Sequence, residues 1–266
     1  ETSKRDGHTS KRSKYCRLAS LVDEEIRERW TNEQNTLRSQ LIEEDCFSEA
    51  FDTEDLENNL TLVGAVDIGY SKTDSRKAIA VLAVLKYPSL EVIYKDHHAE
   101  IQTDCPYVPG FLAFKEVPVY KTLFDRLPAE VRPQVLLVDG NGILHTRNFG
   151  CACHIGVQFN IPTIGVAKKA FEVDGLHKGR VKEICDRDLH VAGDVGFLRG
   201  DSGKVWGAAL RSTQESKNPI FVSVGHKISL ETAIEIVKMT TRFRIPEPVR
   251  QADLRGRQKV KEIYDS

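Results

Sequence analysis

The sequence predicts an α/β fold, in which a mixed β-sheet is flanked by helices in a single domain. Short apolar runs bounded by turn residues recur along the chain and are typical of buried strands. The first three runs follow one another with short links, as in an antiparallel meander, whereas the later ones alternate with helical patterns, as in βαβ units. The 266 residues, 40% of them hydrophobic, are enough to bury one sizeable core.

The N-terminal segment differs in composition from the rest of the chain. Residues 1–19 are basic and carry few apolar side chains, so we expect this tail to be disordered. The folded domain is predicted to span residues 20–266. It begins with an amphipathic helix, because Ser20 is a good N-cap and apolar residues recur at helical spacing between residues 22 and 41.

Three strands are predicted next. Leu62–Val66 is a short apolar run that leads into Asp67. Ala78–Leu85 is continuously apolar, as expected for a strand that is covered on both faces. Leu90–Tyr94 forms a third strand after a proline-containing turn, and it completes the meander.

Helices and strands alternate in the second half of the chain. The predicted elements are a helix after Gly110, a strand Val135–Val138 that ends at Asp139, a helix from about Phe149 to Phe159, strands at Thr163–Val166, Val205–Leu210 and Ile220–Val224, and a helix from Ser229 to about Phe243. Pro246 and Pro248 are expected to stop this last helix. Three strands followed by alternating helices and strands is the order of a ribonuclease H-like sheet.

The overall charge is close to balanced. Lys and Arg number 38 against 39 Asp and Glu, which gives a formal net charge of −1. Proteins that bind nucleic acid are often strongly basic. If this chain binds phosphate, the positive charge must therefore come from local clustering or from a metal ion.

The cysteine pattern and hydropathy bear on where the protein works. Six cysteines occur at irregular positions without a CxxC pair, which predicts a reducing compartment. No apolar run approaches the length of a transmembrane span. We therefore expect a soluble, intracellular protein of the cytoplasm, the nucleus or both, with no membrane partner.

Two aspartates are candidates for chemistry. Asp67 and Asp139 are both predicted at the carboxyl ends of apolar strands, where α/β sheets place their sites. Neighbouring carboxylates raise each other's pKa, and a divalent cation such as Mg²⁺ or Mn²⁺ reverses that penalty. A lone aspartate in this position is more often a turn residue or a helix cap. Two of them, followed by Gly69 and by the glycines of 140–142, favour a site that a substrate backbone can approach closely.

Four further side chains are weaker candidates. Glu116 would be a third acid if its predicted helix brought it to the aspartates, which spacing alone does not show. Lys168 follows a buried strand and could steady the charge on a phosphoryl group. His226, before a helix, could orient water or move a proton, and His145 is treated in the same way. A solvated side chain is the alternative for each of them.

A loop with two prolines presents an aromatic residue. Pro106 and Pro109 stiffen the segment around Tyr107, so this ring has little conformational freedom left to lose. Beside an acidic site, such a ring is suited to stack on bases or to wedge between them. A tyrosine buried in the core is the alternative interpretation.

Six motifs together resemble the endonuclease V family, in that family's order. They are Gly64-Ala65-Val66-Asp67, the segment from Pro106-Tyr107-Val108-Pro109-Gly110 to Lys115-Glu116, Leu137-Val138-Asp139-Gly140-Asn141-Gly142, Ile164-Gly165-Val166-Ala167-Lys168-Lys169, Ser223-Val224-Gly225-His226, and Arg244-Ile245-Pro246-Glu247-Pro248-Val249-Arg250. The resemblance covers roughly residues 60 to 255, nearly all of the predicted domain. The resemblance implies a ribonuclease H-like fold and a metal-dependent endonuclease directed to inosine.

The resemblance also implies roles for individual residues. Asp67 and Asp139 would bind Mg²⁺, with Mn²⁺ able to substitute, and Glu116 would complete the acidic site through water. Lys168 and His226 would act around the scissile phosphate, and Tyr107 would fill the gap left by the displaced base. The expected nucleic-acid contacts are Tyr107, Pro109, Gly110, Leu112, Gly140 and His145.

The reaction implied is cleavage at the second phosphodiester bond 3′ of inosine, giving a 5′-phosphate and a 3′-hydroxyl. The sequences of residues 133–142 and 168–169 resemble those of animal members, so we expect a preference for single-stranded RNA over DNA. We also expect a monomer. Two other hypotheses stay open: a non-catalytic module that binds inosine-containing RNA, and another ribonuclease H-like nuclease that acts on DNA.

Overall fold

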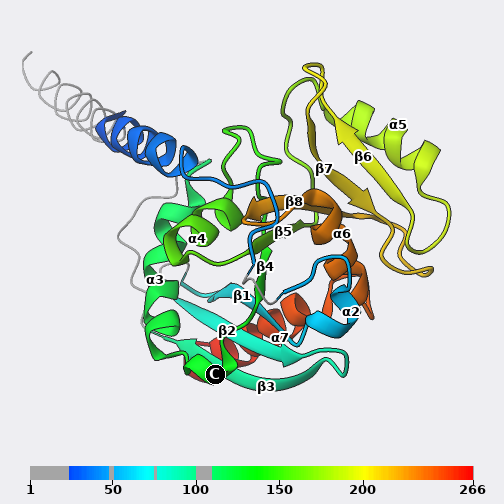
Figure 1. Ribbon diagram of the computed structural model, residues 1–266. Coiled ribbons are helices and arrows are strands. Elements are labelled where there is room, and N and C mark those ends of the chain that lie inside the picture. Colours follow the sequence, from blue (N-terminus) through cyan, green and yellow to red (C-terminus); the bar gives the residue numbers. More distant parts are fainter. Residues whose placement is uncertain (1–23, 48–50, 75–76, 100–109, 266) are drawn as a thin grey trace, which may run out of the picture.

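The computed structural model describes residues 24–47, 51–74, 77–99 and 110–265. Within these ranges the strands form one mixed sheet of eight strands in the order β3-β2-β1-β4-β5-β8-β7-β6 (Figure 1). The predicted α/β fold, with a mixed sheet flanked by helices in a single domain, is confirmed. None of the described helices is both long and apolar enough to cross a membrane.

The predicted meander forms one half of the sheet. β1 (Leu62–Tyr70), β2 (Ala78–Lys86) and β3 (Glu91–His98) pair antiparallel, with β2 in the middle. Every residue of β2 except Lys86 is buried, which accounts for the continuous apolar run. β1 extends beyond the predicted end at Val66, because its last residues still pair with β2.

The second half of the sheet contains both strand directions. β4 (Val135–Asp139) and β5 (Thr163–Ala167) run parallel to β1 and are joined by α4 (Cys151–Phe159). β8 (Ile220–His226) is antiparallel to β5, and β7 (Val205–Leu210) and β6 (Val195–Arg199) follow it. The carboxyl ends of β1, β4 and β5 therefore share one edge of the sheet, which we call the site edge. The carboxyl end of β8 lies at the opposite edge.

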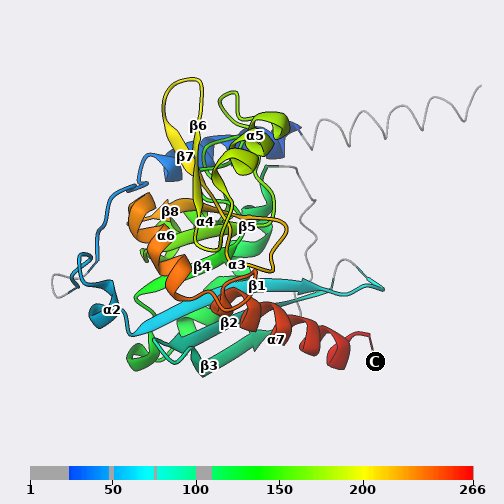
Figure 2. The same ribbon diagram turned by 90° about the vertical axis from the view of Figure 1, so that its right-hand side faces the viewer.

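Helices cover both faces. α3 (Leu112–Arg126) and α4 pack on one face, and α6 (Leu230–Met239) and α7 (Glu247–Ile263) pack on the other. Figure 2 shows α7, in red, running along β1 and β2. A helix over residues 24–38 confirms the predicted N-terminal helix where the chain is described, and its Trp30 ring stacks on Phe114 with centroids 5.2 Å apart.

Five of the described elements were not predicted: α2 (Leu56–Asn59), the short 3-10 helix η1 (Ala129–Val131), α5 (Lys178–Asp188), β6 and α7. The expectation that Pro246 and Pro248 only stop a helix was incomplete. α6 already ends at Met239, and these prolines begin α7. Proline suits a first helical turn, whose N–H groups have no partner within the helix.

Candidate active site

Asp67 and Asp139 lie side by side. Val66 pairs with Val138 in parallel register, so the two aspartates are the next residues along adjacent strands, and adjacent strands lie about 4.8 Å apart. Side chains alternate along a strand, and the neighbours two residues before them, Ala65 and Leu137, belong to the same core cluster. Both carboxylates therefore face α7. Asp139 ends β4 as predicted, whereas Asp67 lies inside β1 rather than at its end.

The surroundings of Asp67 favour its neutral form unless a cation is present. Burial raises the pKa of Asp67 from 3.8 to about 7, and the Asp139 carboxylate contributes to the same shift. The Lys168 ammonium opposes it. Asp67 is enclosed by protein atoms but still partly open to solvent, as a site that admits a ligand must be.

Lys168 completes the group at the site edge. Its Nζ lies 2.5 Å from Oδ2 of Asp139, in an ion pair in which the lysine side chain remains 46% exposed. The lysine follows β5, which pairs with β4 through Asp139 and Val166. A flexible ammonium at this place can contact either the carboxylate or a phosphate group.

Glu116 lies near enough to Asp67 for the Asp67 carboxylate to affect its pKa. It is buried on α3, and it accepts hydrogen bonds from the Tyr70 hydroxyl at 3.4 Å and from the Cys151 thiol at 3.6 Å. Burial raises the pKa of Glu116 from 4.5 to about 7, the Asp67 carboxylate adds to the rise, and the two hydrogen bonds oppose it. The predicted third acid is thus electrostatically coupled to Asp67.

The donor set fits Mg²⁺ or Mn²⁺. Across the described part of the chain, no three His, Cys, Asp or Glu side chains are grouped closely enough to hold a metal by themselves. Mg²⁺ does not need such a cage, because it keeps several waters and is usually bound by one or two carboxylates and substrate phosphates. Two adjacent carboxylates, with a raised pKa at Asp67, are the arrangement that a divalent cation stabilises. Asp67 and Asp139 would hold it.

The raised pKa values predict how stability depends on pH. Between about pH 4 and pH 7 the folded, metal-free protein binds more protons at Asp67 and Glu116 than the unfolded chain does. These two acids therefore contribute a stabilisation that falls as the pH rises through this window, by an amount on the order of a few kcal/mol, against the opposite contribution of the buried histidines whose pKa is lowered to about 4. Urea unfolding at a series of pH values, without metal, measures this slope.

Saturating Mg²⁺ competes with those protons, so it should stabilise the protein more at about pH 8 than at about pH 5. The Asp67→Asn variant is the control: between pH 4 and pH 7 the wild type should lose stability relative to this variant, because the variant lacks the falling contribution of Asp67. The same pH slope in both proteins would contradict the raised pKa of Asp67.

A fourth acid, Asp253, was missed in the sequence. It lies on α7 and raises the pKa of Asp67, while its own carboxylate pairs with Arg257 at 2.8 Å. α7 packs closely on β1, because a Cβ added to Gly69 would lie only 3.1 Å from the Gly256 carbonyl carbon. The available signal was the spacing of buried positions in this helix, which are Val249, Ala252, Gly256 and Val260.

The structure does not bring His226 to the site. His226 pairs with Thr163 at the start of β5, whereas Ala167, next to Lys168, pairs with Phe221. The histidine therefore lies at the opposite edge of the sheet, where it is buried and its Nδ1 accepts a hydrogen bond from the Ile42 amide at 3.3 Å. Burial lowers its pKa to about 4. The predicted catalytic role of His226 is wrong on these positions.

The predicted recognition loop is partly described. Gly110 has a φ of +85°, and a Cβ there would lie 3.4 Å from the Arg147 side chain and 4.0 Å from the His145 ring. His145 is buried, which lowers its pKa to about 4. Leu112 is 40% exposed at the start of α3. The predicted contacts Tyr107 and Pro109 lie outside the described residues.

Gly140 leaves space for the close approach of a substrate backbone that the sequence predicted. A Cβ there would meet only the Cβ of Cys151, at an ordinary contact distance of 3.5 Å. The residue is partly exposed next to Asp139. The site edge thus joins Asp67, Asp139, Glu116 and Lys168, and the loop at Gly110 and His145 forms a second group.

Comparisons with known proteins agree with this geometry. A family model described as Endonuclease V matches residues 45–254. Mouse Endonuclease V is 46% identical, covering 91% of this chain and 72% of the mouse protein, and human Endonuclease V is 45% identical, covering 90% and 84%.

Solved structures give the same result. The crystal structure of human ENDOV matches with a TM-score of 0.82 at 44% identity, covering 88% of this chain and 98% of that one. Endonuclease V of Ciona intestinalis, in complex with a 24mer DNA containing an inosine followed by a ribo-adenosine, matches with a TM-score of 0.80 at 35% identity, covering 91% and 99%. The chain belongs to the endonuclease V family.

Proposed function

We propose that this nuclease hydrolyses single-stranded RNA that contains inosine, at the second phosphodiester bond 3′ of the modified base. The cut would leave a 5′-phosphate and a 3′-hydroxyl, and it would require Mg²⁺, for which Mn²⁺ can substitute. The observation that carries the proposal is the pair of adjacent carboxylates, Asp67 and Asp139, with Lys168 on the second. Two further proposals accompany it: the protein acts as a monomer, and it acts in the cytoplasm or nucleus.

Each residue of the site would have its own role in hydrolysis. A divalent cation, when bound, supplies positive charge that stabilises the phosphate and the leaving oxygen. Asp67 and Asp139 would hold it. Lys168, released from its ion pair with Asp139, contacts a phosphate oxygen. Glu116, with a pKa of about 7, can accept a proton from water near neutral pH.

Recognition of the base lies apart from this chemistry. The turn at Gly110, next to His145, matches the family's base-binding loop, and its backbone can approach a ligand closely because Gly110 has no side chain. Separate recognition and reaction sites agree with a cut displaced from the inosine. The Ciona enzyme was captured on a strand with a ribonucleotide after the inosine, which supports a substrate with ribose near the cut.

The test compares matched single strands that differ in one feature. We expect efficient cleavage of an RNA with one inosine, at the second bond 3′ of it, when Mg²⁺ is present. The same strand with adenosine, and the inosine strand with a chelator, should stay intact. The all-DNA inosine strand should be cut more slowly than the RNA.

The other outcomes separate the alternatives. Tight binding of inosine RNA without cleavage would favour the non-catalytic module. Cleavage that ignores inosine would favour another ribonuclease H-like nuclease.

A further inference from the structure

A basic groove starts at the site edge and leads away from it. It has a volume of about 1100 Å³ and is lined by Lys168, by α5 and by the loop between β7 and β8. Seven of the lining side chains are Lys or Arg and two are Glu or Asp, an excess of five positive charges in a chain whose net charge is −1. Because Lys168 lines the groove and also pairs with Asp139, the groove adjoins the acidic residues of the site edge.

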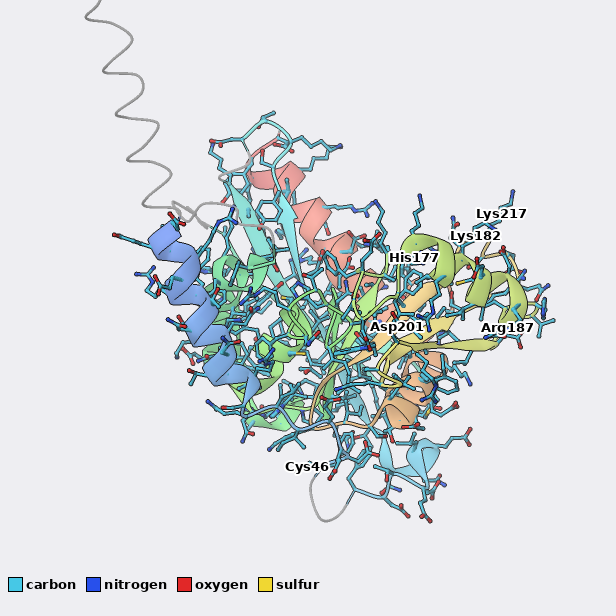
Figure 3. All side chains as sticks on the ribbon, turned by 90° about the horizontal axis from the view of Figure 1, so that it is seen from above. Cys46, His177, Lys182, Arg187, Asp201 and Lys217 are labelled. Atoms are coloured by element: carbon cyan, nitrogen blue, oxygen red, sulfur yellow. The ribbon has the colours of Figure 1, made fainter. Side chains whose placement is uncertain are left out.

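Three of these lysines are available to a ligand. Lys169, Lys178 and Lys217 are exposed, and no acidic side chain of the described ranges forms an ion pair with them. Lys182 pairs with Asp186. Figure 3 shows Lys182 of α5 beside Lys217 of the β7–β8 loop, so the two walls both present ammonium groups.

Two arginines hold the walls in place. Arg211 donates to the His190 carbonyl at 2.8 Å, and Arg244 donates to the Pro219 carbonyl at 3.0 Å. A backbone carbonyl that accepts a hydrogen bond from a guanidinium holds it in place, and because the carbonyl has no net charge, the positive charge of the arginine is not neutralised. The groove therefore keeps the positive potential of these arginines while its shape is set.

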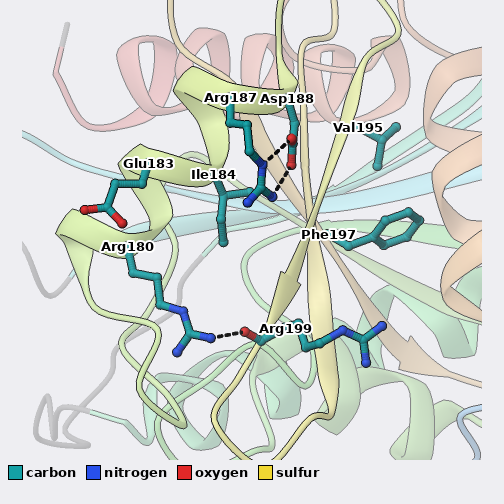
Figure 4. Close-up of a pocket in the computed structure, with 8 residues that line it drawn as sticks. All are labelled: Arg180, Glu183, Ile184, Arg187, Asp188, Val195, Phe197 and Arg199. Carbon is teal, nitrogen blue, oxygen red and sulfur yellow. Dashed lines mark hydrogen bonds and ion pairs between the residues drawn. The ribbon is translucent and has the colours of Figure 1, made fainter.

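A second hollow on α5 shows the contrast. Figure 4 shows Arg180, Arg187 and Arg199 around it, with Arg187 paired to Asp188. Arg180 pairs with Asp201 and also donates to the carbonyl of Arg199. Acids thus pair with two of the three arginines, and Arg199 donates to the Gly203 carbonyl at 2.6 Å, so this hollow attracts phosphate less than the groove does.

An aromatic ring lies between the groove and the recognition loop. Phe171 lines the groove and is 43% exposed. Its ring packs edge-on against His145, with centroids 4.9 Å apart, and His145 in turn lies next to Gly110. Exposed rings beside lysines are the usual platform for the bases of a single strand.

We propose that this groove binds the single-stranded segment of the substrate on the 3′ side of the cut. Lys169, Lys178 and Lys217 contact its phosphates, and Phe171 stacks on one of its bases. This inference rests on the proposed function, because the strand enters the site with inosine at the Gly110 loop and leaves past Lys168. In this arrangement the loop takes the 5′ side, and the groove offers a basic path for the 3′ side.

The experiment uses full-length protein and two inosine RNAs with the same 5′ side. One ends just after the cut, and the other continues for several nucleotides. In the Lys178→Gln/Lys217→Gln variant, the KM for the long strand should rise roughly tenfold or more, with kcat unchanged and the short strand unaffected. The slope of log affinity against log salt for the long strand should fall by about 1.4, the share of two phosphate contacts.

A matched control removes two charges from the opposite edge. Lys86 pairs with Leu62 at the start of β1, and Lys227 follows His226, so Lys86→Gln/Lys227→Gln should leave both strands unaffected. Equal effects of the groove variant on the two strands, or none on the long one, would overturn the inference. So would an effect seen only when the strand is extended on its 5′ side.

Binding separates this inference from the proposed function. If the wild type cuts neither strand, the proposed function fails, and fluorescence anisotropy on the long strand still decides the groove. If the slope of log affinity against log salt is the same for the groove variant and the wild type, the inference about the groove is rejected.

Discussion

The Asp139→Asn variant should lose cleavage of an inosine-containing strand by roughly a thousandfold or more. Asn keeps the shape of the side chain but removes the charge that pairs with Lys168 and that would hold the cation with Asp67. Losing a single oxyanion donor already costs about 10²–10³ in rate, and here both the cation and the lysine lose their anchor. Single-turnover cleavage in saturating Mg²⁺ measures the effect.

Two controls test whether the loss is specific to the active site. Asp125→Asn on α3 removes an equivalent charge from an exposed pair with Lys121, and it should cleave like the wild type. Binding of an uncut strand by the Asp139→Asn variant should stay within a few-fold of normal, since recognition depends on other groups. Robust cleavage by this variant would remove Asp139 from the mechanism.

The Gly142→Ala variant should be destabilised by about 4 kcal/mol or more, or fail to fold. A Cβ at this position would lie 1.9 Å from the Val224 carbonyl oxygen, so the β4–α4 connection would have to move away from β8. The sequence suggested that this glycine makes room for a substrate. The structure shows instead that it makes room for a neighbouring strand.

Gly140→Ala is the matched control, because its added Cβ meets only an ordinary contact. Its midpoint in urea unfolding should be close to that of the wild type. If Gly142→Ala unfolds at the same midpoint as Gly140→Ala, the close packing of this connection on β8 is wrong.

The strands could be predicted because burial on both faces leaves a clear signal. β2 and β4 have continuous apolar runs, and the sequence indicated both nearly to the residue. Where β1 ends was less visible, since residues after Asp67 are paired on one side only and are partly exposed. The sequence identified both aspartates as candidates. Their position side by side depends on the pairing of β1 with β4, which are distant in the chain.

Strand direction explains the error at His226. A run such as 220–226 has the same pattern whichever way it crosses the sheet, so the sequence does not show at which edge its carboxyl end lies. Antiparallel pairing with β5 carries His226 away from Lys168.

The polar composition of α7 and α5 explains why neither helix was predicted. α7 is rich in charged residues and has two prolines at its start, which suggested an end to helical structure rather than a start, and with it Asp253 was missed. α5 is similarly polar, so the basic groove could not be anticipated from residues 178–188 alone. In both cases packing against the sheet, rather than the intrinsic pattern, decides the structure.

The central claim is that Asp67 and Asp139 share one divalent cation at the edge of the sheet. A crystal of the protein soaked in Mn²⁺, measured for anomalous scattering, tests it directly. We predict a peak roughly 2 Å from an oxygen of each aspartate, with the Lys168 ammonium displaced from Asp139. A crystal saturated with Mn²⁺ in which Lys168 still pairs with Asp139, and no peak lies between the two aspartates, would contradict the account.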